Sequence, residues 1–263
     1  MRRHWKAFLA AAIVVAALTV AALILGTRND QPAAVAAAPV AGGGKLGFPV
    51  SPVRIGSGGS GVAADGRTPI GYDGSCDSAA AAAANFMPVI ADVRPSAWPA
   101  QRKALAQIDV NTGELSDLAT LAGLGAKTLK LPNWRSFDGD WVTKTDVAAG
   151  GLYRMVTCID RDKALVQLVY ASIDAGTEGA KASFVTQALD LGWQGSDWKV
   201  TRSQIPVGST DLTLGGRLPD RGPNLAALPA PDGRPPVLTR DLADQAFKDV
   251  TREGWIEYAN ALR

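Results

Sequence analysis

The sequence has little histidine, cysteine or aromatic content. The only histidine is His4, which precedes the first long apolar run. The rest of the chain therefore has no imidazole for a Ser-His-Asp or Cys-His nucleophile, and it lacks the ligands of common zinc sites. Asp138 and Asp140 lie in a glycine-containing segment that favours a turn over a calcium site. We expect no enzymatic activity, no metal and no cofactor.

The sequence also lacks an excess of either charge. It has 27 basic and 25 acidic residues. Arg2, Arg3 and Lys6 precede the apolar run, so the chain beyond it has 24 basic and 25 acidic residues, a net charge of −1. A nearly neutral exterior has no basic surface of the kind that binds nucleic acid. We expect no direct contact with nucleic acid.

One long hydrophobic run is present. Ala7–Leu25 has no charged residue, and a helix of this length rises roughly 28 Å, close to the thickness of the bilayer's hydrocarbon core. Basic residues precede the run and Asp30 follows it, which predicts a cytoplasmic tail (1–6), a transmembrane helix (7–26) and an extracytoplasmic remainder. A cleaved signal peptide is the alternative, and it also places the folded part outside the cytoplasm.

Residues 27–75 are rich in alanine, proline and glycine and predict a flexible tether. A folded domain is expected over residues 76–205. Helical spacing of apolar residues predicts helices over 78–93, 97–108 and 113–124. Alternating spacing then predicts antiparallel strands over 152–160, 163–174, 183–193 and 198–203. Helices followed by a meander predict an α+β fold with the helices packed on one face of a curved antiparallel sheet.

Cys76 and Cys158 both fall in the expected extracytoplasmic domain. An oxidising compartment allows them to pair, and closing so long a loop stabilises a fold by on the order of 4 kcal/mol. Two separately buried thiols are the alternative.

Four aromatic residues are candidates for lining an apolar pocket between the helices and the sheet: Phe86, Trp98, Tyr170 and Trp193. Packing of the same side chains in the core is the alternative.

The last part of the chain predicts a proline- and glycine-rich loop over 206–238 and a helix over 239–263. Phe247, Val250 and Tyr258 lie in an apolar stripe of that helix. The stripe either binds a partner protein or packs against the domain.

Three segments carry a resemblance to a known family: the helix at Cys76–Met87, the strand at Leu165–Ile173 and the hairpin at Gly192–Lys199. Together with the expected anchor and tether, they resemble the extracytoplasmic NTF2-like domains of single-pass membrane proteins in actinomycete-type bacteria. Those proteins are associated with conjugation and type IV-like secretion. The resemblance covers roughly residues 72–203 and implies a non-enzymatic scaffold that associates with itself and with other components of the complex.

The sequence thus supports a membrane-anchored scaffold or accessory subunit of a cell-envelope conjugation or secretion complex. Its partners would be the membrane, further copies of the chain and other envelope proteins. The alternative function is an extracytoplasmic domain that binds a lipid or small molecule.

Overall fold

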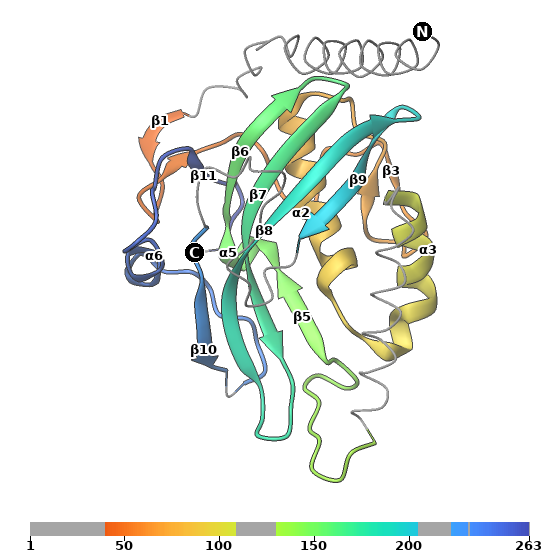
Figure 1. The fold of residues 1–263 in the computed structure, drawn as a ribbon, viewed down its shortest axis with the longest axis vertical. Helices are drawn as coiled ribbons and strands as arrows, with labels where there is room; N and C mark the ends of the chain where they lie inside the picture. The colour runs from red at the N-terminus through yellow and green to blue at the C-terminus, as the bar shows by residue number, and fades with distance from the viewer. Residues whose placement is uncertain (1–39, 109–129, 205–221, 231, 263) are drawn as a thin grey trace, which may run out of the picture. The chain divides into compact units, whose positions relative to one another are not determined.

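The computed structural model describes residues 40–108, 130–204, 222–230 and 232–262 (Figure 1). The strands are β1 (Val40–Gly43), β2 (Pro49–Val50), β3 (Gly61–Val62), β4 (Pro69–Ile70), β5 (Thr143–Asp146), β6 (Leu152–Ile159), β7 (Lys163–Asp174), β8 (Lys181–Gln194), β9 (Asp197–Gln204), β10 (Leu225–Pro229) and β11 (Trp255–Glu257). The α-helices are α2 (Cys76–Ala91), α3 (Trp98–Ile108), α5 (Val147–Gly150) and α6 (Arg240–Ala246), and a 3₁₀ turn, η1, covers Pro95–Ala97.

A long hairpin of β7 and β8 forms the centre of a nine-stranded sheet, as Figure 1 shows. The two strands pair without interruption from Lys163 opposite Gly192 to Asp174 opposite Lys181. β6 and β9 flank one half of the hairpin, and β5 and β10 flank the other half. Every residue of β7 between its two exposed ends is buried. The sheet is therefore covered on both faces, in agreement with the nearly continuous apolar run of β7.

The expected fold class, a transmembrane helix and a tether followed by helices packed on a curved antiparallel sheet, is wrong. β11 pairs antiparallel with β6 but parallel with β2, so the sheet is mixed rather than antiparallel. In the part of the chain that the structure describes, no helix is long and apolar enough to cross a membrane, and the segments expected as tail and anchor, 1–6 and 7–26, lie outside it. The described residues form a sheet-rich, mixed α+β fold with four α-helices.

Helix α2 covers one face of the sheet. The hydroxyl of Ser75 caps its first turn by accepting from the backbone N–H of Ser78. Ala79–Ala84 are all buried, and their small side chains let the helix lie close to the strands. Two buried hydrogen bonds join the helix to other elements: Trp198 Nε1 donates to Ser78 Oγ (3.0 Å), and the Tyr258 hydroxyl donates to the carbonyl of Ala80 (3.1 Å).

The opposite face is covered by segments that are far apart in the sequence. Phe48 comes from the chain before β2, Phe247 follows α6, and Trp255 begins β11. The centre of the Phe247 ring lies 4.9 Å from the centre of the Phe48 ring and 5.7 Å from that of the Trp255 ring. These side chains pack on a second core cluster that includes Leu152 and Phe184 of the sheet.

Residues 44–55 are held by residues 257–260, an arrangement that we call the Glu257 clasp. The buried carboxylate of Glu257 accepts from the backbone N–H of Leu46 (2.9 Å) and Phe48 (3.3 Å). A Cβ at Gly44 would lie 2.2 Å from this carboxyl group, so any other residue there would displace the carboxylate from the clasp. Asn260 completes the clasp through hydrogen bonds with both the N–H and the carbonyl of Ile55.

The clasp corrects the expectation of a tether over 27–75 for residues 40–75; residues 27–39 lie outside the described part of the chain. Residues 40–75 contain β1 to β4, and Leu46 and Phe48 are buried in the domain. Glycines with positive φ, such as Gly47 and Gly56, provide the turns that return this segment to the sheet. Isolated apolar residues between such turns pack in the core, and the hydrogen bonds of the clasp hold the backbone around them.

The end of the chain also differs from the expectation. The helix expected over 239–263 ends at Ala246, and the chain continues into β11 after Gly254, which has a φ of 77°. The loop expected over 206–238 contains β10, while residues 205–221 lie outside the described part. The helix expected over 113–124 lies outside it as well.

Candidate functional site

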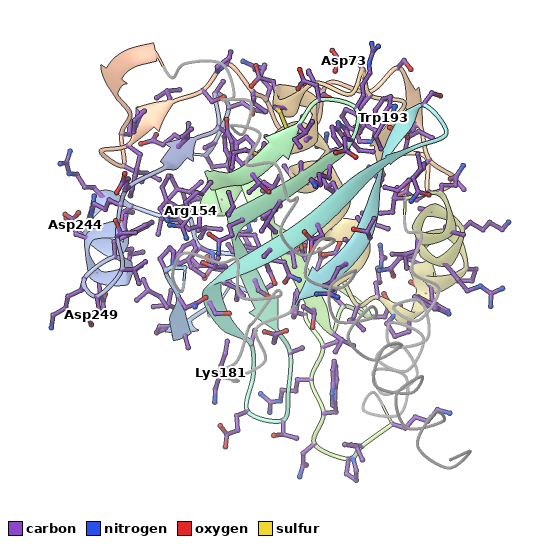
Figure 2. All side chains as sticks on the ribbon, turned by 45° about the horizontal axis from the view of Figure 1, so that its top comes forward. Asp73, Arg154, Lys181, Trp193, Asp244 and Asp249 are labelled. Carbon is purple, nitrogen blue, oxygen red and sulfur yellow. A yellow bond between two sulfur atoms is a disulfide. The ribbon has the colours of Figure 1, made fainter. Side chains whose placement is uncertain are left out.

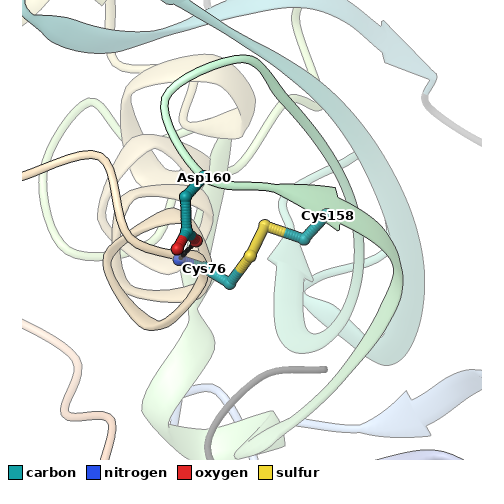
Figure 3. Close-up of side chains that lie close together, drawn as sticks. All are labelled: Cys76, Cys158 and Asp160. Atoms are coloured by element: carbon teal, nitrogen blue, oxygen red, sulfur yellow. Dashed lines mark hydrogen bonds between the residues drawn. A yellow bond between two sulfur atoms is a disulfide. The ribbon is translucent and has the colours of Figure 1, made fainter. Parts of the chain in front are cut away.

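The disulfide between Cys76 and Cys158 is confirmed (Figure 3). It joins the first residue of α2 to β6 with a Cα–Cα distance of 5.9 Å. The carboxylate of Asp160 accepts from the backbone N–H of Cys76 (2.9 Å) beside it. The cysteines and Asp160 lie close enough together to suggest a metal site, but sulfur atoms joined in a disulfide do not supply thiolate ligands. This cluster therefore fixes the start of α2 on the sheet.

The four aromatic residues expected to line a pocket do not come together. Phe86 and Tyr170 are buried in the main core, where the Phe86 ring meets Tyr72 edge-on at 5.9 Å. Trp98 and Trp193 are half-buried on α3 and β8. Figure 2 shows Trp193 near Asp73. None of the four lines the cleft described below.

The expected partner stripe is also corrected. Phe247 and Tyr258 are buried inside the domain, and Val250 is half-buried against the second core cluster. The stripe is not exposed because the chain after α6 folds back as β11 instead of continuing as a helix. The exposed side of this region carries charged residues of both signs instead: Asp244 and Asp249, which are labelled in Figure 2, and the basic Arg240 and Lys248.

The structure brings charged residues together around a cleft of about 150 Å³. The cleft lies where the end of α2, the start of α3, the turn between β3 and β4 and the loop before β5 meet. Its lining residues are Asp65, Arg67, Asp92, Arg94, Ala97, Ala100, Gln101 and Trp141. This cleft is the candidate functional site.

Asp92, directly after α2, is 5% exposed. Its Oδ1 accepts from both the backbone N–H and the hydroxyl of Thr145, each at 2.8 Å, which joins the end of α2 to β5. Burial raises the pKa of Asp92 to about 6, although the hydrogen bonds from Thr145 act in the opposite direction. The carboxyl group therefore changes its charge close to neutral pH.

Arg94 lies at the edge of the cleft, and its guanidinium lies 5.1 Å from the centre of the Trp141 ring. Its Nε donates to Asp140 Oδ1 (2.9 Å), and the backbone N–H of Ser96 donates to Asp140 Oδ2 (2.7 Å). Burial acts to raise the pKa of Asp140, but the hydrogen bonds from Ser96 and Arg94 outweigh it and lower the pKa to about 2. Asp140 therefore holds Arg94 in place at neutral pH.

Arg67 comes from the turn between β3 and β4. Its Nε lies 3.4 Å from Asp65 and one terminal nitrogen lies 3.5 Å from Asp92 Oδ2. Asp65 also accepts from the backbone and the hydroxyl of Thr68, which fixes the turn. Gln101 forms the floor with Asp92: its Nε2 donates to the carbonyls of Val89 and Asp92, each at 2.7 Å. The cleft can bind a small polar molecule through charges and hydrogen bonds.

Sequence reasoning did not identify these residues, apart from placing Asp140 in a turn. One signal was present: Asp65-Gly66-Arg67 and Asp92-Val93-Arg94 are both Asp-x-Arg triplets, and the fold brings them together. The triplet alone is not specific, because Asp232-Gly233-Arg234 repeats it without lining the cleft.

Comparisons of this chain with protein-family models, with curated proteins and with solved structures gave no match.

Proposed function

We propose that this chain is a non-enzymatic, membrane-anchored scaffold or accessory subunit of a cell-envelope complex of the conjugation or secretion type. The apolar run Ala7–Leu25 supplies the anchor, and the folded residues lie outside the cytoplasm. The Cys76–Cys158 disulfide supports this location, because disulfides persist in oxidising compartments.

The observation that carries the proposal is the Glu257 clasp. The clasp attaches residues 44–55 to the domain, and 14 residues, 26–39, separate the apolar run from β1 in the sequence. A chain of that length spans at most about 50 Å when fully extended. A short connection limits how far a domain can move from a membrane anchor, and this suits a subunit that assembles with neighbouring membrane proteins.

The experiment is crosslinking in intact cells, followed by gentle solubilisation and purification through a C-terminal tag. Two altered chains accompany the wild type. One carries a cleavable signal peptide in place of residues 1–26, and the other carries about 20 extra Gly and Ser residues between Ala38 and Pro39, which lengthens the tether without touching the clasp.

We expect other envelope proteins to co-purify with the wild type, fewer with the lengthened tether and none with the released domain. All three chains should contain the disulfide, which controls for folding. Recovery of the wild type as an isolated monomer, or an equal yield of partners from all three chains, would contradict the proposal.

A further inference from the structure

The cleft has hydrogen-bond acceptors on its floor. Gln101 is 5% exposed, and its Nε2 donates to two carbonyl groups, which fixes the amide so that Oε1 is left as an acceptor. Within the described part of the chain, no donor reaches that oxygen. Asp92 uses Oδ1 for both hydrogen bonds from Thr145, so its Oδ2 has only the long contact with Arg67 at 3.5 Å. A ligand group with several N–H donors and a positive charge fits this floor.

The rim of the same cleft has hydrogen-bond donors. Arg94 has a side chain that is 42% exposed, and it uses Nε for Asp140. Its two terminal nitrogens have no partner among the residues that the structure describes. Arg67 lies on the other side of the cleft, and one of its terminal nitrogens also has no partner among the residues that the structure describes. Planar guanidinium groups bind carboxylates through paired hydrogen bonds, so the rim fits a carboxylate.

The two halves of the cleft lie close together. A terminal nitrogen of Arg67 is 3.5 Å from Asp92 Oδ2, so a positive and a negative protein group are adjacent. An α-amino acid carries its ammonium and carboxylate groups on one carbon and matches this spacing. Ala97, Ala100 and Trp141 supply an apolar wall for a side chain. A cavity of about 150 Å³ holds a molecule of about the size of benzene, which limits the ligand to an amino acid with a small side chain.

We propose that this cleft binds a small zwitterion, a free α-amino acid. Its ammonium group donates to Gln101 Oε1 and Asp92 Oδ2. Its carboxylate accepts from Arg94 and Arg67, and its side chain lies along Trp141. This inference does not depend on the scaffold function proposed above, since a scaffold with or without envelope partners can hold such a ligand.

The test is calorimetric titration of the purified full chain in detergent micelles with each common amino acid. Isobutylamine and isobutyrate, each carrying one of the two charges, serve as probes of the separate halves. We expect saturable 1:1 binding of at least one amino acid with a small side chain, and at least tenfold weaker binding of both probes.

Two variants locate the binding. Arg94→Gln removes the rim cation and should weaken amino acid binding at least tenfold. Arg102→Gln removes an exposed cation from α3 outside the cleft and should leave the affinity unchanged. If Arg94→Gln does not form the disulfide-bonded fold, Arg67→Gln replaces it with the same expectation.

Three results would overturn the proposal. The first is that no amino acid binds the wild type at about 10 mM. The second is that a probe with a single charge binds as tightly as the best amino acid. The third is that a folded rim variant keeps the wild-type affinity.

Discussion

The two faces of the β7–β8 hairpin are covered in different ways. The first face is covered mainly by α2, whose start is fixed by one disulfide. The second face is covered by Phe48, Phe247 and Trp255, which come from segments some 200 residues apart. The helix that covers most of the first face is one continuous segment of the sequence. The side chains that cover the second face come from segments that are far apart in the sequence. The comparison teaches that the second face depends on the Glu257 clasp, whereas the first depends on a covalent link and close helix packing.

The largest expected effect is on the first face. Replacing both Cys76 and Cys158 by alanine should lower the free energy of unfolding by about 4 kcal/mol, because the disulfide closes a loop with a sequence separation of 82. Urea unfolding measures the change, and reduction of the wild type by dithiothreitol should reproduce it. A loss below about 1 kcal/mol would show that packing alone holds α2 on the sheet.

The next effect is on the second face. Phe48→Ala should cost about 3 kcal/mol, because a fully buried aromatic side chain is removed beside Phe247. Hydrogen exchange should become faster in β11 and α6 while α2 keeps its protection. Phe48→Leu is the milder control. Equal loss of protection in α2 would show that the two faces unfold as one unit.

Close packing of α2 can be tested at Ala83. Ala83→Leu adds volume to a fully buried position and should cost about 2 kcal/mol. Ala106→Leu makes the same change at an exposed position of α3 and should stay within about 0.5 kcal/mol of the wild type. Thermal unfolding of the two variants distinguishes a tight interface from a loose one, and similar melting temperatures would contradict close packing.

The smallest effect concerns the end of the first face, where Asp92 joins α2 to β5. The pKa of Asp92 is raised to about 6, so the folded state binds its proton more tightly than the unfolded state does. The wild type should therefore gain about 1 kcal/mol of stability as the pH falls from 7.5 to 5. Asp92→Asn should lack this gain. Parallel urea titrations at both pH values measure it, and equal pH dependence in the two chains would contradict the assignment.

Much of the first face could be predicted from the sequence. The helix expected over 78–93 is observed as α2, and the strands expected over 163–174 and 183–193 are observed as β7 and β8. Long segments in which apolar residues recur at a regular spacing allow a helix or a strand to be predicted from the sequence. The cysteine pair could be proposed as well, because its two partners were the only cysteines.

The second face could not be predicted in the same way. β2 has two residues and β11 has three, which is too short for an alternating pattern to appear. Leu46 and Phe48 are isolated among glycines and prolines, so the segment has the composition of a linker. Their burial depends on Glu257, more than 200 residues away. The cleft was missed for the same reason, since its charged residues meet only through the tertiary fold.

The Glu257 clasp has a consequence for the order in which the protein can fold. Residues 257–260 leave the ribosome, and any translocation channel, after all the other residues that the clasp joins. The β6–β9 meander can pair while synthesis continues, but β2 has no partner in β11, and Ala80 of α2 has none in Tyr258, until the last residues emerge. Pairing across so long a separation is slow because the closing of a large loop must come first. Until then Phe48 and Leu152 lack the residues that cover them in the folded protein, and exposed apolar surface of this kind favours aggregation.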